Sequence, residues 1–251
     1  MARLLLVSNA KRDGMGYLEH AQEELRDFFA GEVERVLFVP YAAITKSYET
    51  YVEDITPVFR DVLGCEIVSA HRLDDPAAAV AEVDAVVIGG GNTWMLHRKM
   101  RQLGLIDAIR ERALAGTPYM GWSAGSNMAC RTIKSSNDMV ITDPLDFEGL
   151  ALVPFQINPH YIHGNPPGFH GETREQRIHE FCEVNSDVYV AGLPEGMMFR
   201  VESDTIDVRG IDAPLRVFKA GEEDRELTKA DDISFLLDPA QRVEIGVDGP
   251  A

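Results

Sequence analysis

Residues 85–125 read AVVIGGGNTWMLHRKMRQLGLIDAIRERALAGTPYMGWSAG, and this stretch carries the strongest evidence about the fold. Apolar runs at Ala85–Ile88 and Tyr119–Gly121 predict strands. Between them, Trp94–Leu103 and a second stripe around Ile109 have the spacing of amphipathic helices. Strands that are apolar without alternation are typical of a parallel sheet covered on both faces. The stretch therefore predicts two parallel strands joined by helices.

The same alternation continues back to the N-terminus. Further strands are predicted at Arg3–Ser8, Val36–Pro40 and Glu66–Ala70. Helices are predicted over Tyr17–Phe29, over an apolar stripe from Tyr51 to Val62, and over Pro76–Glu82. Pro57 lies inside the second of these helices and must kink or restart it. Repeated strand–helix units predict an α/β protein, a three-layer α/β/α sandwich with a mostly parallel central sheet.

The second half of the chain is less regular. Residues Asp143–Gly171 are rich in Pro, Gly, Asn and His, which predicts loops rather than a second domain. A helix is predicted over Glu172–Cys182, a strand over Asp187–Ala191, and a hairpin between Thr205–Val208 and Leu215–Lys219. We expect one domain over residues 1–239 and a loose tail over residues 240–251.

Composition narrows the function classes. The 251 residues carry 24 basic and 41 acidic side chains, a net charge of −17. Such a surface repels phosphate backbones and anionic bilayers, so we expect neither nucleic acid nor membrane as a partner. No apolar run approaches the length of a membrane span. Three scattered cysteines form no disulfide framework or zinc ribbon, so we expect a protein of the reducing cytoplasm.

The most specific motif is Gly121-Trp-Ser123-Ala-Gly125, a G-x-S-x-G between a predicted strand and the helical stretch Ser126–Cys130. A serine at a tight strand-to-helix turn projects its hydroxyl, and small neighbours let the backbone make that turn. The alternative is that Ser123 only caps the helix. The predicted context favours Ser123 as a nucleophile.

Glycines at 89–91 follow the strand Ala85–Ile88 directly. They do not match the dinucleotide pattern G-x-G-x-x-G, because its third glycine would fall at Trp94. Backbone donors for an oxyanion hole fit better, with the N–H groups of Gly91 and Ala124 as the pair. A glycine turn followed by a helix cap is the alternative.

A serine nucleophile requires a base, and His160 in Ile157-Asn-Pro-His160 is the best placed of seven histidines because Pro159 constrains the backbone before it. His160, His163 and His170 could instead indicate a metal site. No acidic or cysteine ligand stands at metalloprotease spacing, so we expect no metal and no cofactor.

Two acids are candidates to orient the base. Glu195, in Leu193-Pro-Glu195-Gly, follows a predicted strand end, where sites of α/β proteins gather. Asp138 lies between the nucleophile helix and the histidine segment. The residues themselves do not choose between these acids.

Two arginines open a predicted helix in Gly171-Glu-Thr-Arg174-Glu-Gln-Arg177, with Thr173 as a cap. Cations are disfavoured at a helix N-terminus by the helix dipole. Their presence suggests that they hold a substrate carboxylate. Ordinary pairing with Glu172 and Glu175 is the alternative.

With these residues assembled, the chain resembles the peptidase E family of aspartyl dipeptidases. The resemblance rests on segments in the family's order: GGGNT (89–93), GWSAGSNMAC (121–130), SSNDM (135–139), INPHY (157–161), GETREQRI (171–178), LPEG (193–196) and FKAGEE (218–223). The residues after 223 extend past the family's usual end.

The resemblance implies a fold similar to class I glutamine amidotransferases, with serine in place of their usual cysteine. It implies release of N-terminal aspartate from small acidic Asp-Xaa peptides through an acyl-enzyme. Family roles transfer to Ser123 as nucleophile and His160 as base, to Asp138 or Glu195 as the third member, with Glu195 preferred, and to Gly91 and Ala124 as the oxyanion hole. Arg174 matches the residue that binds the aspartyl side chain. A homodimer is left open.

Two rival functions remain. One is a serine hydrolase of the cyanophycinase type, which acts on β-aspartyl peptides. The other is a non-catalytic module that uses the glycine turn as an anion site. A fluorophosphonate probe separates the second from both enzymes, because only an activated Ser123 reacts with it.

Overall fold

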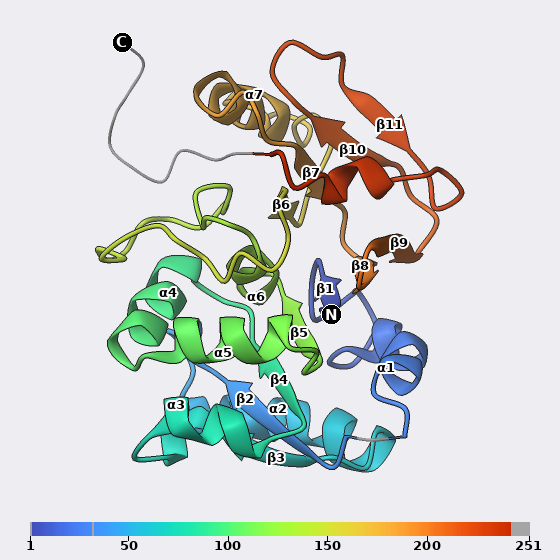
Figure 1. The fold of residues 1–251 in the computed structure, drawn as a ribbon. Coiled ribbons are helices and arrows are strands. Elements are labelled where there is room, and N and C mark those ends of the chain that lie inside the picture. The colour runs from blue at the N-terminus through green and yellow to red at the C-terminus, as the bar shows by residue number, and fades with distance from the viewer. Residues whose placement is uncertain (1, 32, 242–251) are drawn as a thin grey trace.

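The computed structural model describes residues 2–31 and 33–241 (Figure 1). The predicted tail over residues 240–251 therefore lies, except for Ala240 and Gln241, outside the described residues. The chain forms a seven-stranded sheet and a separate four-stranded sheet. Figure 1 places the smaller sheet and α7 at one end of the molecule and β3 with α3 at the other.

The larger sheet has the strand order β3-β2-β4-β5-β1-β8-β9. Its strands are β1 (Arg3–Val7), β2 (Arg35–Val39), β3 (Glu66–Ser69), β4 (Ala85–Ile88), β5 (Tyr119–Trp122), β8 (Met197–Glu202) and β9 (Thr205–Gly210). The first five in that order are parallel. β8 and β9 extend the sheet as antiparallel strands, with β9 at the edge. The prediction of a mostly parallel central sheet is confirmed.

Helices cover both faces of this sheet. One face carries α1 (Gln22–Phe28), α2 (Tyr48–Thr56) and a π-helical turn over Pro57–Val62. The other carries α3 (Pro76–Ala79), α4 (Thr93–Gln102), α5 (Leu105–Leu114) and α6 (Ala124–Ala129). Alternate residues of β1 point to opposite faces, so Leu5 and Leu6 belong to different cores. This double burial explains why the strands lack polar alternation.

Most predicted elements of the first half are found. The helix predicted from Tyr51 to Val62 is α2 followed by the π-helical turn, and Pro57 begins that turn. The proline has no N–H to donate, so the α-helical hydrogen-bond pattern changes there. This confirms the prediction that Pro57 must kink or restart the helix.

The smaller sheet corrects the reading of the second half. It has the order β11-β10-β7-β6 and consists of β6 (Gln156–Pro159), β7 (Val190–Leu193), β10 (Leu215–Phe218) and β11 (Arg225–Leu227), with α7 (Arg174–Val184) against it. The segment predicted as loops contains β6. The predicted hairpin between Thr205–Val208 and Leu215–Lys219 is wrong, because β9 pairs with β8 and β10 pairs with β7 and β11.

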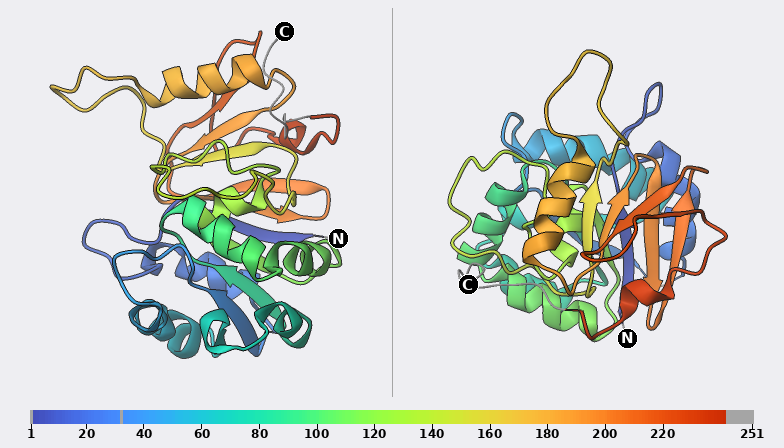
Figure 2. Two further views of the ribbon diagram at one scale, coloured as in Figure 1. Left: turned by 90° about the vertical axis from the view of Figure 1, so that its left-hand side faces the viewer. Right: turned by 90° about the horizontal axis from the view of Figure 1, so that it is seen from above.

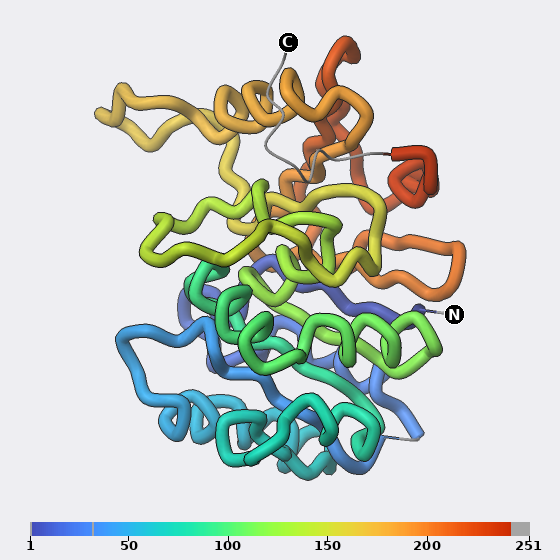
Figure 3. Tube along the Cα trace, turned by 60° about the vertical axis from the view of Figure 1, so that its left-hand side comes forward, coloured from blue at the N-terminus to red at the C-terminus, as the bar shows by residue number. Residues whose placement is uncertain are grey.

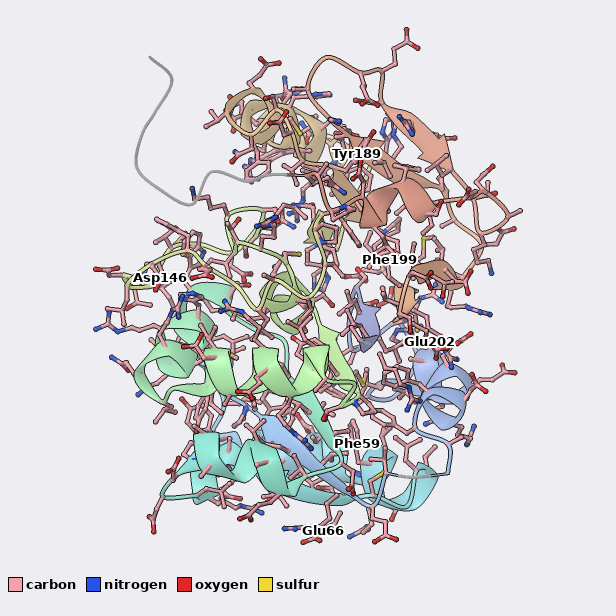
Figure 4. All side chains as sticks on the ribbon, in the orientation of Figure 1. Phe59, Glu66, Asp146, Tyr189, Phe199 and Glu202 are labelled. Carbon is pink, nitrogen blue, oxygen red and sulfur yellow. The ribbon has the colours of Figure 1, made fainter. Side chains whose placement is uncertain are left out.

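The second sheet shares a core with the larger one. Apolar side chains of β6, β7 and β10 join the same cluster as α4, α5 and α6. Phe199, labelled in Figure 4, packs edge to face on Phe155 with ring centroids 5.5 Å apart. The far side of the small sheet packs on α7 through Tyr161, Ile178 and Phe218. The two sheets therefore share one apolar cluster of buried side chains.

Within the described ranges, no helix has the length and apolar character needed to cross a bilayer. Cys65, Cys130 and Cys182 are buried free thiols.

Candidate active site

Ser123 stands at the turn from β5 into α6. Its backbone has φ 53° and ψ −112°. Residues other than glycine rarely adopt a positive φ. The Ser123 N–H donates to Val7 O of the neighbouring β1 (3.0 Å). The backbone strain is held by surrounding contacts, as is common where a side chain must be presented to a ligand.

The two glycines of the motif let this turn pack. A Cβ on Gly125 would overlap Ile88 O, and a Cβ on Gly121 would overlap the Gly125 carbonyl group. Tyr119 Oη also donates to Gly125 O (2.6 Å). The spacing G-x-S-x-G is therefore required by the close approach of α6 to β4 and β5.

His160 and Glu195 reach Ser123 from the smaller sheet. His160 Nε2 lies 2.9 Å from Ser123 Oγ, and His160 Nδ1 lies 2.6 Å from Glu195 Oε1. β6 and β7 are parallel, with Pro159 opposite Leu193. Because parallel strands end at the same edge, the residues that follow them become neighbours. The three side chains form one hydrogen-bonded line across the two sheets.

Ser8 joins the segments that carry this line. It is fully buried at the end of β1. Its hydroxyl donates to Leu193 O (2.8 Å) and accepts from His160 N (2.9 Å). The next residue, Asn9, accepts from Gly196 N through Oδ1 (2.7 Å). Sequence reasoning missed both residues, although polar side chains at the carboxyl end of a buried strand were the available signal.

Asp138 lies beside α4 rather than beside His160. Its Oδ2 accepts from Thr93 N (2.7 Å), Thr93 Oγ1 (2.6 Å) and Ser136 Oγ (3.0 Å). Among the described residues, no donor is hydrogen-bonded to Oδ1. The structure therefore brings Glu195 to His160 and leaves Asp138 on another wall of the same cleft.

Gly91 follows β4 with φ 139°, and a Cβ there would overlap Ala42 O. Among the described residues, no acceptor takes its N–H. Ala124 is the first residue of α6, where the N–H has no partner within the helix. Gly91 and Ser123 line one cleft. The N–H groups of Gly91 and Ala124 are therefore both without an acceptor among the described residues.

The two arginines of α7 differ. Arg177 forms an ion pair with Glu172 (Nε to Oε2, 3.4 Å), one of the two surface partners given as the alternative to carboxylate binding. Arg174 Nη1 is buried and has no hydrogen-bond partner among the described residues. Burial and Arg177 lower the pKa of Arg174, while Asp138 opposes that shift. Thr173 caps the helix in a full capping box with Gln176, which confirms the predicted cap.

The loop before α7 projects from the molecule. Figure 3 and the left view of Figure 2 show it in yellow-gold, on the same side as the blue loop after β1. Glu175 anchors the start of this loop. Its Oε1 accepts hydrogen bonds from Tyr161 Oη (2.8 Å) and Gly164 N (3.1 Å), and His163 Nδ1 lies 2.6 Å from the same oxygen. Burial alone would raise the pKa of Glu175, but hydrogen bonds to its carboxylate lower it to about 2.

The cleft at Ser123 has a volume of about 470 Å³. Besides the residues above it is lined by Lys11, Tyr17, Lys46 and Trp122. A larger hollow of about 710 Å³ lies elsewhere, around Arg131 and Phe235, and has no histidine in its lining. We place the site at the smaller cleft because the reactive groups converge there. Within the described residues, no group of three or more His, Cys, Asp or Glu side chains is arranged to hold a metal ion.

An α/β fold with a serine at a strained strand-to-helix turn, in contact with a histidine, defines the class of serine hydrolases. The profile of peptidase family S51 matches residues 4–209. The chain belongs to this family and is a peptidase of the serine type.

Curated relatives named peptidase E align over nearly the whole chain. The protein from Nostoc sp. (strain PCC 7120) is 45% identical over 238 residues, which covers 95% of this chain and 98% of the relative. The Streptomyces coelicolor protein is 43% identical over 244 residues, covering 97% and 98%. The Salmonella typhimurium protein is 41% identical over 220 residues, covering 88% and 95%.

Solved structures share the fold at low sequence identity. A peptidase from an acI-B1 Actinobacterium superposes with a TM-score of 0.66 at 20% identity, covering 94% of this chain and 97% of that one. A protein from Listeria monocytogenes superposes with a TM-score of 0.62 at 20% identity, covering 84% and 99%.

Proposed function

We propose that this peptidase releases N-terminal aspartate from dipeptides, with Ser123 as nucleophile, His160 as base and Glu195 as the orienting acid. The observation that carries the proposal is the hydrogen-bonded line from Ser123 Oγ through His160 to Glu195 Oε1. The similarity to peptidase E relatives supports the dipeptidase class.

The reaction begins when His160 Nε2 takes the proton of Ser123 Oγ as that oxygen attacks the aspartyl carbonyl carbon. Glu195 accepts a hydrogen bond from Nδ1–H and stabilises the imidazolium that forms. The N–H groups of Gly91 and Ala124 stabilise the oxyanion, and each such donor contributes about 3 kcal/mol in comparable sites.

The C–N bond then breaks, and the His160 proton passes to the leaving amine. This leaves an aspartyl ester on Ser123. His160 next removes a proton from water, whose oxygen attacks the ester. The proton returns to Ser123 Oγ as free aspartate leaves.

Arg174 binds the aspartyl side-chain carboxylate in this proposal. A buried guanidinium nitrogen without a partner is costly, and an anionic ligand supplies the missing acceptor. Asp138 is an electrostatic neighbour of Arg174 and lines the cleft. Its unbonded Oδ1 is a suitable acceptor for the substrate's α-ammonium group.

The test is hydrolysis of Asp-Leu, Leu-Leu, N-acetyl-Asp-Leu and β-Asp-Leu by the wild type and by Ser123→Ala. The proposal expects cleavage of Asp-Leu alone, lost in the variant. Cleavage of β-Asp-Leu instead would contradict it and favour the cyanophycinase-type reaction. Equal cleavage of Leu-Leu would refute the aspartyl specificity.

Arg174→Met and Arg177→Met form a matched pair for the side-chain site. Arg174→Met is expected to raise KM for Asp-Leu about 10- to 100-fold, because a charge-assisted contact is lost. Arg177→Met removes a neighbouring cation paired with Glu172 and is expected to change KM little. Equal effects of the two variants would rule out a specific role for Arg174.

A further inference from the structure

One wall of the cleft is aromatic and takes no part in the reaction described above. The Tyr17 ring centroid lies 6.2 Å from that of Tyr51 and 6.0 Å from that of Trp122. Trp122 Nε1 donates to Tyr51 Oη (3.1 Å), which donates to Gly90 O (2.8 Å). The aromatic wall is thus hydrogen-bonded to the glycine turn through Tyr51, and it includes Trp122, the residue directly before Ser123.

Two lysines lie on the aromatic wall. Lys46 Nζ is 4.3 Å from the Tyr51 ring centroid and 5.6 Å from that of Tyr17. Lys11 Nζ is 5.2 Å from the Tyr17 centroid. The face of an aromatic ring attracts an ammonium group at these distances. Both lysines line the same cleft as Ser123 and His160.

This end of the cleft carries net positive charge. Lys46 Nζ lies 2.7 Å from Asp54 Oδ2, so one of the two charges is partly neutralised. Within the described ranges, Lys11 has no ion pair. Burial raises the pKa of Tyr17 to about 12, so its phenol is uncharged near neutral pH. In a chain of net charge −17, a local cationic site is needed to attract an anionic group.

The aromatic wall that carries the lysines and the segment that carries Asp138 pack against opposite faces of the large sheet. Tyr51 and Trp122 belong to the core on the α1–α2 face. Trp94, whose indole N–H donates to Asp138 O (3.0 Å), belongs to the core on the other face. Asp138 is in turn the electrostatic neighbour of Arg174. A substrate whose aspartyl part is held at Arg174 therefore directs its second residue across Ser123 toward the aromatic wall.

We propose that Lys11 and Lys46 bind the C-terminal carboxylate of the residue that leaves, and so restrict the enzyme to dipeptides. This inference rests on the proposed function, because it takes the aspartyl end to lie at Arg174. A free dipeptide has its carboxylate one residue beyond the cleaved bond. A longer or amidated peptide presents a neutral amide there and cannot form an ion pair.

The test compares Asp-Leu with Asp-Leu-amide in the wild type, in Lys11→Met and Lys46→Met, and in the double variant. The ratio of kcat/KM for acid over amide is expected to fall about tenfold in the double variant, mainly through KM. Methionine keeps an apolar stem, so folding is preserved. An unchanged ratio would overturn the proposal.

Lys219→Met is the matched control. Lys219 Nζ lies 4.6 Å from the Tyr189 ring centroid and 3.4 Å from Glu222 Oε1. Tyr189, labelled in Figure 4, lies at the end of the molecule that holds the small sheet. The control therefore removes a lysine from a similar aromatic and acidic setting outside the cleft, and it should leave the ratio unchanged.

A second readout does not depend on aspartyl specificity. Free leucine, which carries the carboxylate, should slow fluorophosphonate labelling of Ser123 in the wild type more than leucinamide does. The double variant should lose that difference. If Asp-Leu is not cleaved but the difference appears and is lost as expected, the proposed function fails and the lysine site stands. If leucine and leucinamide protect equally in the wild type, the lysine site is overturned.

Discussion

The two sheets contribute to the candidate site in different ways. Ser123 and Gly91 follow β5 and β4 of the large sheet, within strand–helix units built from neighbouring sequence. His160 and Glu195 follow β6 and β7, which pair across an intervening loop and α7. The nucleophile side is thus set by local structure, and the base side by non-local pairing. Ser8 hydrogen-bonds the end of β1 to both segments of the base side.

The largest expected effect comes from the large sheet. Ser123→Ala removes the nucleophile, and kcat for Asp-Leu should fall at least about 10⁴-fold. Steady-state hydrolysis measures this, and an unchanged melting temperature shows that the fold is intact. Residual activity near the wild-type level would end the assignment of Ser123.

The small sheet should have the next largest effect. Glu195→Gln keeps the shape of the side chain but removes the charge that stabilises imidazolium, so kcat should fall about 10³-fold. Asp138→Asn is the comparison variant. It should act mainly on KM, because Asp138 contacts Thr93 and Ser136 rather than His160. If the two variants exchange these effects, Asp138 is the orienting acid.

The junction between the sheets is tested by Ser8→Ala. The change removes one of two donors to Leu193 O, which keeps Tyr161 N (3.1 Å), and it leaves His160 N without its acceptor. The His160 backbone is then less firmly held, so kcat should fall about 10- to 100-fold. The free energy of unfolding should fall by about 1–3 kcal/mol. Ser69→Ala, which removes another buried hydroxyl bonded to His71 (2.7 Å), is the stability control. Equal losses of activity in both variants would argue against a positioning role for Ser8.

The smallest effect on activity is expected at the loop before α7, where the change acts on stability and depends on pH. The pKa of Glu175 is about 2 in the folded chain and 4.5 in the reference state. A carboxylate with a depressed pKa contributes its stability above pH 4.5 and loses it as the pH falls toward about 2. This contribution is at most about 3 kcal/mol.

Urea unfolding of the wild type and Glu175→Gln should show a difference near pH 7 that shrinks between pH 4.5 and pH 2. A difference that is independent of pH would show that the hydrogen-bond geometry, rather than the charge, stabilises the loop.

Strand positions were predicted more accurately in the large sheet, which is built from local units, than in the small sheet, which depends on non-local pairing. β4 was predicted at its observed bounds, because an apolar run between turn residues identifies a buried strand locally. β7 begins at Val190, three residues after the predicted start at Asp187, because its pairing with β6 and β10 sets its ends.

The hairpin error has a specific cause. Ser203 has φ 61° and turns the chain between β8 and β9, so β9 pairs with the strand before it. The sequence offers no glycine at Ser203 to mark that turn, and the strand Met197–Glu202 went unpredicted. β9 and β10 then reach different sheets, which their local patterns do not reveal.

Taken alone, the sequence determined the turn that presents Ser123, because the glycine spacing and the flanking strand and helix are all local. It also identified Arg174 as an unusual cation at a helix start. Only the tertiary structure decided which acid meets His160, since that contact spans 35 residues and depends on the parallel pairing of β6 with β7. Likewise, only folding brought Lys11 and Lys46 onto the same tyrosine, because the two loops follow different strands of the large sheet.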